Sequence, residues 1–426
     1  KTHPARRLLA PLCVPTGFGD RWTAVWESTL TPDLTVYLLE HDVLYDRAGL
    51  YGDARGDYGD NVLRFALLSR AALMLPNYLG WKADVIHVHD WQTALIPAYA
   101  RAIGSPVPTV LSIHNLGYQG HHGADQLAAT GLGPEWFDAR GLEYLGDINL
   151  LKGGILHATY LSTVSPRYAF EIQTPAGGAG LDGVLRFRRA DLVGILNGID
   201  DVQWDPRTDP HLPARFGPDD LSGKAICKAA LQREMGLEPR ADVPLVGLVS
   251  RFVEQKGIDV FAAALLELLH HDLQFVVLGS GARWAEELFT RMSSESWRFR
   301  ARIGFDEGLA HRIEAGADLF VMPSRYEPCG LNQMYSQRYG TLPVVRAVGG
   351  LYDTVEHERT GFVFEQLSGG ALAEVVLRAA DTVVLRKAHH RFMQVAAMRK
   401  PMGWDSSAAQ YEALYRLAMA RRAGRR

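Results

Sequence analysis

The stretch that decides the fold is Pro323-Ser324-Arg325-Tyr326-Glu327-Pro328-Cys329-Gly330-Leu331-Asn332. It follows residues 317–322, a short apolar run that predicts a buried parallel strand. Residues 332–339 contain no glycine or proline and are expected to form a helix. In a doubly wound sheet such a loop lies beyond the carboxyl end of its strand, where helix N–H groups face an anion. The stretch therefore predicts one carboxylate, Glu327, beside an anion-binding cradle.

The rest of the chain alternates predicted strands and helices. In the first half, strands are predicted at residues 33–40, 84–89, 109–113, 160–164 and 192–196, with helices at 59–75, 93–102 and 148–157. In the second half, strands are predicted at 244–250, 274–278, 317–322, 343–346 and 361–364 and before 304–305, with helices at 258–271, from 284, and at 307–315. Polar residues end most of these strands, which is typical of parallel α/β sheets with one functional edge.

Five prolines and many charges lie between residues 205 and 242, which indicates a domain boundary. We expect an N-terminal Rossmann-like domain over 1–205 and a second over 206–403. Residues 404–426 are expected to form a C-terminal helix that packs back on the N-terminal domain, with Tyr411, Leu414, Tyr415 and Ala418 on one face.

Composition excludes several classes of function. The chain has 426 residues, 47% hydrophobic content and a net charge of -3, so no bulk attraction to nucleic acid or membranes is expected. Its 3 cysteines are far apart, which fits a reducing cytoplasm rather than a disulfide framework or a zinc site. No apolar run has the length of a membrane span. The first residue is Lys1 rather than methionine, and we expect the N-terminus to be incomplete.

Arg251 and Lys256 flank the predicted strand-to-helix loop at residues 251–257. Two cations beside a helix end suit a diphosphate, although a solvated pair of surface cations has the same sequence pattern. Gly279-Ser280-Gly281 lacks the third glycine of a dinucleotide fingerprint, and the chain has no Gly-Lys-Ser/Thr loop. The pattern thus favours a phosphate-bearing ligand without a nicotinamide signature.

These motifs together resemble the bacterial glycogen synthases and plant starch synthases of glycosyltransferase family 5. In the second half the matching segments are SRFVEQKG at 250–257, PSRYEPCGL at 323–331, YGTLP at 339–343 and GGLYDTV at 349–355. In the first half they are DNVLRF at 60–65, HVHDW at 87–91, HNLGYQG at 114–120, LKGG at 151–154, TVSP at 163–166 and LNGID at 196–200.

The resemblance implies a GT-B fold, in which two Rossmann-like domains face a central cleft. It implies a retaining enzyme that transfers glucose from ADP-glucose to the non-reducing end of an α-1,4-glucan, with no cofactor and no metal. The matching residues imply catalytic roles for Glu327, His114, Arg251, Lys256 and Asp90. They imply nucleotide-sugar contacts by Arg251, Lys256, Asn197, Phe305, Cys329, Gly330 and Leu331, and an acceptor or glucose pocket that includes Asp90, Trp91, His114, Asn115 and Tyr118.

Each of these residues also has a structural interpretation. Asp90 and Asn197 can cap helices, and Glu327 can close a capping interaction. His114 can be a satisfied core histidine, Cys329 a small buried residue, and Trp91 a packing residue.

One departure from the family keeps a second class of function open. The family begins with a Lys-x-Gly-Gly-Leu loop, but here Lys1-Thr2 is followed by His3-Pro4, and no Gly-Gly-Leu precedes Gly349. If the chain truly lacks this loop, it could be a noncatalytic glucan-binding or scaffold protein. A starch synthase is a further alternative. A glycogen phosphorylase is disfavoured because no pyridoxal-lysine context is found. A retaining glycosidase needs two carboxylates about 5 Å apart, and Glu327 has no evident partner acid in sequence.

Overall fold

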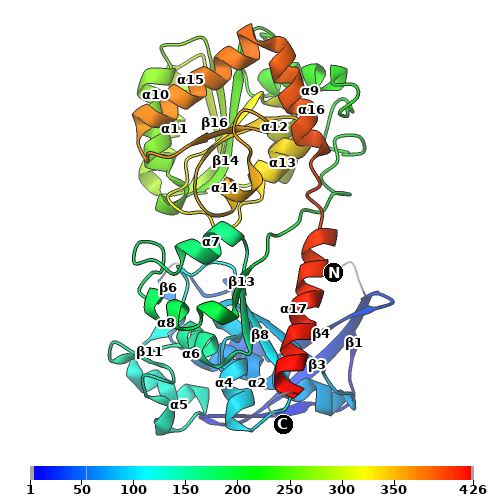
Figure 1. Ribbon diagram of the computed structural model, residues 1–426, viewed down its shortest axis with the longest axis vertical. Helices are drawn as coiled ribbons and strands as arrows, with labels where there is room; N and C mark the ends of the chain where they lie inside the picture. The colour runs from blue at the N-terminus through cyan, green and yellow to red at the C-terminus, as the bar shows by residue number, and fades with distance from the viewer. Residues whose placement is uncertain (1–3, 54, 424–426) are drawn as a thin grey trace. The chain divides into compact units, whose positions relative to one another are not determined.

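The computed structural model describes residues 4–53 and 55–423 (Figure 1). The chain divides into two compact units. Unit 1 contains the described residues up to Thr163, together with Ile172–Val193 and the chain from Tyr411 onward, and unit 2 contains Val164–Glu171 and Gly194–Gln410. The short segment in which the Lys-x-Gly-Gly-Leu loop was sought, residues 1–3, lies outside the described residues.

The bounds of these units differ from the predicted domains 1–205, 206–403 and 404–426. Residues 194–205 and 404–410 belong to unit 2. The backbone explains this difference, because Ile199 N donates to Met402 O at 2.9 Å and Ile199 forms a parallel bridge with Gly403. The two segments are thereby tied to each other, and both enter unit 2.

A parallel sheet forms the centre of unit 1. Its strand order is β13 (Leu192–Gly194), β12 (Tyr160–Thr163), β8 (Thr109–Ile113) and β7 (Ile86–His89). β8 pairs in parallel with both β7 and β12, and all five of its side chains are buried. Helices α2 (Asn61–Leu79), α4 (Leu95–Ala102) and α6 (Leu150–His157) bury apolar faces in this unit. The strands predicted at 84–89, 109–113 and 160–164 are therefore confirmed to within a few residues.

The strand predicted at 33–40 forms, but it lies outside the parallel sheet. It is β4 (Leu34–Glu40), which pairs antiparallel with β3 (Gly19–Thr31), and β3 also pairs with β1 (Arg6–Arg7) and β2 (Leu12–Thr16). The prediction of a parallel strand here was wrong. Only Pro32 and Asp33 separate β3 from β4, and so short a connection can join only an antiparallel hairpin.

Unit 2 contains a larger parallel sheet. The order is β16 (Phe299–Ile303), β15 (Gln274–Gly281), β14 (Leu245–Phe252), β17 (Leu319–Met322), β18 (Leu342–Arg346) and β19 (Phe362–Phe364). All neighbouring pairs are parallel. The predicted strands of the second half are confirmed, with shifts at their ends.

Apolar side chains cover both faces of this sheet because strand residues alternate in direction. On one face Val246 and Leu248 of β14 pack in a core with residues of α10 (Ile258–Leu268), α11 (Arg283–Glu295) and α15 (Gly369–Leu385). On the other face Leu245 packs with residues of α9 (Ser222–Glu234) and α12 (Glu307–Gly316). Figure 1 shows these helices on the two sides of the unit 2 sheet. The result is a doubly wound α/β unit.

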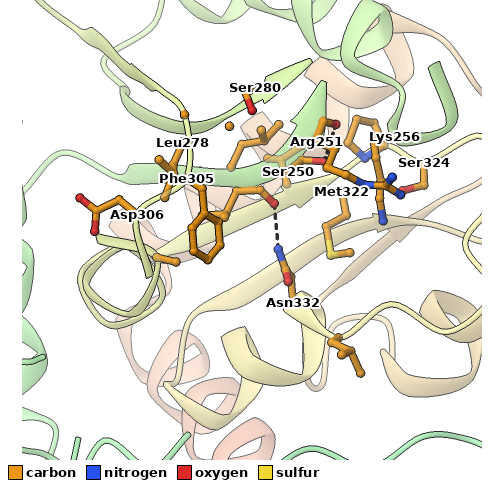
Figure 2. A pocket seen from close by; sticks show the side chains of 18 residues that line it. Ser250, Arg251, Lys256, Leu278, Ser280, Phe305, Asp306, Met322, Ser324 and Asn332 are labelled. Atoms are coloured by element: carbon orange, nitrogen blue, oxygen red, sulfur yellow. Dashed lines mark hydrogen bonds between the residues drawn. The ribbon is translucent and has the colours of Figure 1, made fainter. Parts of the chain in front are cut away.

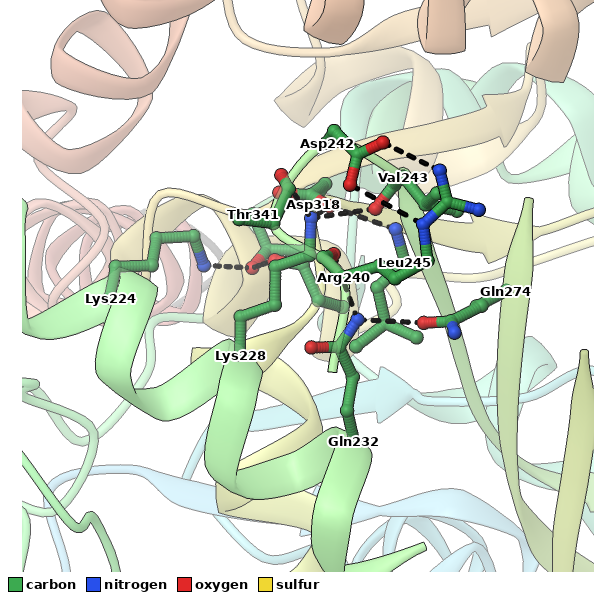
Figure 3. A network of polar contacts seen from close by, with 12 residues as sticks. Lys224, Lys228, Gln232, Arg240, Asp242, Val243, Leu245, Gln274, Asp318 and Thr341 are labelled. Carbon is green, nitrogen blue, oxygen red and sulfur yellow. Dashed lines mark hydrogen bonds and ion pairs between the residues drawn. The ribbon is translucent and has the colours of Figure 1, made fainter. Parts of the chain in front are cut away.

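A buried polar network fixes α9 to the amino ends of the central strands (Figure 3). Lys228 Nζ lies 2.8 Å from Asp318 Oδ2, which also accepts the Leu245 N–H at 2.8 Å. One turn earlier, Lys224 Nζ donates to Thr341 Oγ1 at 2.6 Å and to Ala315 O at 2.9 Å. Both ammonium groups are nearly buried yet have partners, so their burial carries a reduced cost.

The C-terminal helix α17 (Asp405–Ala423) enters unit 1 at Tyr411. Leu414 and Ala418 are 3% and 0% exposed, and the Tyr415 hydroxyl lies 2.7 Å from His87 Nδ1. From Tyr411 onward this helix belongs to unit 1. Among the helices that the structure describes, none combines the length and apolar character needed to cross a membrane.

Shorter elements complete the described chain: α1 (Asp42–Tyr45), β5 (Gly52–Asp53), β6 (Gly56–Asp57), α3 (Asp90–Thr93), β9 (His121–His122), η1 (Ala124–Gln126), α5 (Leu127–Thr130), η2 (Pro134–Trp136), β10 (Glu143–Tyr144), β11 (Asp147–Asn149), α7 (Pro166–Glu171), α8 (Asp182–Phe187), η3 (Arg189–Asp191), η4 (Glu254–Lys256), α13 (Asn332–Arg338), α14 (Gly349–Thr354) and α16 (Lys387–Arg399).

Candidate active site

Glu327 lies in the loop between β17 and α13, and its side chain is nearly buried. The residue is 4% exposed. Its Oε2 accepts from Lys256 Nζ at 2.5 Å and from Ser324 Oγ at 3.1 Å. Lys256 belongs to η4, which follows β14 at the neighbouring position in the sheet. The fold therefore brings together the carboxylate and one of the two cations that the sequence singled out, although 71 positions separate them.

Two glycines set the backbone of this loop. Gly349 has φ +42, and a Cβ on it would lie 1.9 Å from Glu327 O. The next residue, Gly350, donates its N–H to that same oxygen at 3.1 Å. Gly257 packs in the same way, because a Cβ there would lie 2.0 Å from Pro323 O. Side chains at these positions would displace the loop that carries Glu327.

A cavity of about 280 Å³ opens beside Lys256, and Glu327 itself does not line it (Figure 2). Its lining includes the side chains of Arg251, Lys256 and Phe305. Figure 2 shows the two cations close together at one end and the Phe305 ring at the other. Ser250, Ser280, Asp306, Ser324, Leu331 and Asn332 also line the cavity. The arrangement suits a ligand that has an anionic group at one end and a flat ring at the other.

Arg251 lies on a strand rather than in the loop where the sequence placed it. β14 runs through Phe252, two residues beyond the predicted end at Ser250, because it pairs with β15 up to Gly281. On the other side of the cavity, Asn332 Nδ2 donates to Val249 O at 2.8 Å and joins the start of α13 to β14. The position of Arg251 is thus set by sheet pairing.

The other residues predicted to contact the nucleotide sugar differ in exposure. Phe305 is 89% exposed and Leu331 is 38% exposed, so both side chains at the cavity are accessible to a ligand. Gly330 has φ +71, which favours glycine. Cys329 is buried, and burial raises the pKa of its thiol to about 12. The thiol also forms a hydrogen bond with the backbone of Asn197. Cys329 and Asn197 do not line the cavity, so their predicted ligand contacts stay predictions.

In unit 1, the predicted histidine and aspartate are in direct contact. Asp90 Oδ1 accepts the backbone N–H of His114 at 2.7 Å. Asp90 has φ +55, an uncommon conformation for a residue other than glycine, and burial raises the pKa of its carboxyl group. Its side chain does not cap α3, so the helix-cap interpretation does not hold for Asp90. Asp90 instead fixes the loop that presents His114.

The sequence missed a chain of histidines behind His114. His114 Nε2 lies 2.9 Å from His89 Nδ1, and the His89 and His87 rings are 4.3 Å apart. His87 Nε2 in turn lies 2.7 Å from Ser112 Oγ. Burial is the main cause that lowers the pKa of His87 to about 3. The alternation of His87 and His89 on β7 indicates that both side chains lie on one face of the strand. The sequence does not show that His114, after β8, lies next to them.

Trp91, Asn115 and Tyr118 are near His114 in sequence, but their environments differ. Trp91 is 8% exposed and packs edge-on against Phe65, with ring centroids 4.7 Å apart, so it is a packing residue. Asn115 Oδ1 accepts the Gly117 N–H at 3.0 Å and shapes the turn. Tyr118 is 53% exposed. Of these three side chains, Tyr118 is the one most available to an acceptor.

Comparisons with known proteins agree with this geometry. Residues 3–187 match the family model described as starch synthase catalytic domain, and residues 243–382 match glycosyl transferases group 1. A protein named glycogen synthase from Anaeromyxobacter sp. (strain Fw109-5) is 54% identical over 97% of this chain and 89% of its own length.

The chain belongs to the glycogen synthase family. Glycogen synthase 1 from Geobacter metallireducens is 47% identical over 98% of this chain and 86% of its own length. The solved catalytic domain of starch synthase IV from Arabidopsis thaliana, bound to ADP and acarbose, matches with a TM-score of 0.90 and 32% identity, covering 98% of this chain and 88% of that one. This member of the glycogen synthase family is therefore a GT-B glycosyltransferase, and a noncatalytic protein is not favoured.

Proposed function

We propose that this chain transfers glucose from ADP-glucose to the non-reducing end of an α-1,4-glucan, with retention of configuration and without a cofactor. The observation that carries the proposal is the 2.5 Å contact between Glu327 and Lys256, which lines the same cavity as Arg251 and Phe305. The relatives named glycogen synthase and the solved starch synthase bound to ADP support the same substrate class.

The proposed reaction gives roles to several residues that line this cavity and to Glu327 and Gly330, which lie in the loop between β17 and α13 and do not line it. Arg251 and Lys256 bind the diphosphate and offset the negative charge that grows on the departing ADP. Phe305 offers its exposed ring to the base. Glu327 accepts hydrogen bonds from the glucose hydroxyls and balances positive charge at the anomeric carbon. Leu331 and Gly330 supply backbone donors to the distal phosphate and sugar.

The proposed reaction proceeds on one face of the sugar. The bond between the anomeric carbon and the phosphate oxygen breaks, and the acceptor oxygen forms its new bond on the face that the phosphate leaves. The proton of the acceptor hydroxyl passes to the leaving phosphate oxygen. Such a route needs no second carboxylate as a nucleophile, in contrast to retaining glycosidases. At the position eight residues after Glu327 the chain has Tyr335, so no second Glu occupies it.

His114 and Asp90 have proposed roles that rest on the family resemblance and on the contact between them. His114 contacts the glucose, and Asp90 holds the backbone of His114 by its 2.7 Å hydrogen bond. A cytoplasmic location is part of the proposal, because Cys13, Cys227 and Cys329 are all free thiols. Among the described residues, no cluster of three or more His, Cys, Asp or Glu residues suits a metal ion.

The test compares ADP-glucose with UDP-glucose as donors and glycogen as the acceptor. We expect ADP release that depends on glycogen, a clear preference for ADP-glucose, and a product whose new linkages are fully cleaved by an enzyme specific for α-1,4 bonds. Glucan binding without transfer from either donor would overturn the proposal and would restore the noncatalytic alternative. Elongation of starch as the better acceptor would favour a starch synthase.

A further inference from the structure

A second cavity lies within unit 1, at the edge of the sheet opposite to His114. Its volume is about 620 Å³. Thr109, Thr159 and Asp191 line it, and these residues stand at or just before the amino ends of β8, β12 and β13. His89, Asp90 and His114 lie instead at or after the carboxyl ends of β7 and β8. The cavity is therefore separate from the candidate active-site residues of unit 1.

Cations dominate the lining of this cavity. Among the described residues that line it are five arginines and one carboxylate: Arg101, Arg140, Arg188, Arg421, Arg422 and Asp191. They come from the end of α4, the loop after η2, the segment after α8 and the end of α17. Segments far apart in sequence thus place their positive charges around one hollow. The whole chain, by contrast, has a net charge of -3.

Three of these arginines have structural roles, and one of them, Arg422, donates to the carbonyl oxygens of Ser105 and Pro106. Arg188 is nearly buried, and it donates to Asp191 Oδ2 at 2.9 Å and to the carbonyl oxygens of Leu156 at 3.0 Å and Ala158 at 2.7 Å. Arg421 also pairs with Asp191. One carboxylate is therefore shared by two guanidinium groups, and the charge of the site is not balanced by its own residues.

Arg101 and Arg140 are different, because both are exposed and neither guanidinium group makes an ion pair or a hydrogen bond with another described residue, although the backbone N–H of Arg140 donates to Asp138. Their donors face solvent at the cavity and can bind an anion at little cost in stability. The pKa of the neighbouring His157 is lowered in part by positive charges around this cavity. Burial is the main cause that lowers its pKa to about 4, and the charges of Arg101, Arg188 and Lys152 add to this effect.

The cavity also has an apolar rim. Phe187, at the end of α8, is 79% exposed and lines the same space. A volume of 620 Å³ is within the range of pockets that hold small organic molecules, which is about 300–1,000 Å³. A free phosphate ion would occupy only a small part of this space. An exposed aromatic ring beside guanidinium groups suits a ligand that has both a phosphoryl group and a carbon skeleton.

We propose that this cavity of unit 1 binds a small phosphorylated organic molecule, with its phosphoryl group at Arg101 and Arg140 and its carbon skeleton against Phe187. The site is distinct from the cavity at Arg251, and the proposal does not depend on the reaction proposed above.

The test measures binding by calorimetry at constant ionic strength, with inorganic phosphate and a hexose 6-phosphate as the two probes. We expect the hexose phosphate to bind the full chain more tightly than phosphate. The double variant R101Q/R140Q should weaken both by roughly tenfold or more, since each lost guanidinium removes a charge-assisted hydrogen bond. F187A should weaken only the hexose phosphate.

Two matched variants control for charge and for the donor site. R378Q/R416Q removes the same charge from exposed helix pairs that lie outside the cavity, and it should leave binding unchanged. R251Q should also leave it unchanged. Equal binding by R101Q/R140Q and the full chain, an equal loss in R378Q/R416Q, or a loss in R251Q alone would each overturn the proposal. Equal affinity for phosphate and hexose phosphate would overturn its organic part.

Discussion

Lys256 Nζ donates to Glu327 Oε2 at 2.5 Å, so the charge of Lys256 is balanced within unit 2. Arg251 lines the same cavity but makes no ion pair with another described residue. The net positive charge that the cavity offers to an anion therefore comes from Arg251. Lys256 has a second function, which is to pair with a nearly buried carboxylate.

This division predicts different effects for the two cations. Arg251→Gln should weaken ADP binding by about tenfold or more, because it removes a guanidinium that has no competing partner in the unit. Lys256→Gln should weaken ADP binding less but lower kcat, because it leaves Glu327 without its ion pair. Titration of ADP by calorimetry, combined with steady-state kinetics, separates the two. The reverse order of ADP affinities would contradict this assignment.

Glu327 is predicted to act on turnover more than on binding. Glu327→Gln keeps the shape of the side chain and removes its charge, and it should lower kcat by about 100- to 1,000-fold, as expected for an electrostatic group at the reacting centre. The affinity for ADP should change little. Glu327→Ala should also lower stability, because it leaves Lys256 unpaired. Near wild-type kcat in Glu327→Gln, measured by ADP release, would refute the proposed role.

The position of Glu327 depends on Gly349, which gives a prediction that needs no change in the site itself. Gly349→Ala places a Cβ 1.9 Å from Glu327 O at φ +42, so the loop must move, and we expect kcat to fall by more than tenfold. Gly370→Ala is the matched control, since a Cβ there meets nothing within 4 Å and its φ is ordinary. It should keep full activity and unchanged thermal stability. Similar losses in both variants would show that the contact with Glu327 is unimportant.

Asp90 provides a comparable test in unit 1. Asp90→Asn keeps an acceptor for the His114 N–H and tolerates φ +55, so it should fold normally. Asp90→Ala loses the acceptor and keeps the strain, and it should lose about 1–3 kcal/mol in the free energy of unfolding. Chemical denaturation measures this difference. If the two variants are equally stable, the hydrogen bond to His114 is not what holds this loop.

The β17–loop–α13 segment could be predicted because its signals are local. An apolar run, prolines and a helical stretch follow one another within residues 317–339. The pairing of β4 could not be predicted from its own pattern, since alternation defines a strand but not its partner. The two-residue connection after β3 was the missing signal. Predictions for the second half were more accurate because each strand there begins a separate βα unit.

Long-range contacts between charged side chains could not be predicted from the sequence for a different reason. Lys224, Lys228 and Gln232 are spaced by four on α9, and such a row usually indicates a solvated face. The fold buries it against the loops before β17 and β18. The arginine-lined cavity is similar, since Arg101 and Arg421 are distant in sequence. The family resemblance named Lys256 and Glu327 but not the contact between them.

Glu314 predicts a pH dependence of stability that is independent of catalysis. It is 2% exposed on α12, and its Oε2 accepts from Ser336 Oγ at 2.6 Å. Burial raises the pKa of its carboxyl group to about 8, from an ordinary value of 4.5. Between these two values the folded chain keeps a proton that the unfolded chain loses. The contribution of Glu314 is therefore fully present below pH 4.5 and is lost as the pH rises towards 8.

Glu314→Gln replaces the neutral acid with a neutral amide and removes this dependence. We expect the variant to be no more stable than wild type near pH 5 and to gain relative stability at each step up to pH 8, with no further change above it. Urea unfolding of both proteins at pH 5, 6, 7 and 8 measures the difference in the free energy of unfolding. A difference that stays constant from pH 5 to pH 8 would show that the fold does not raise the pKa of Glu314 and would contradict this prediction.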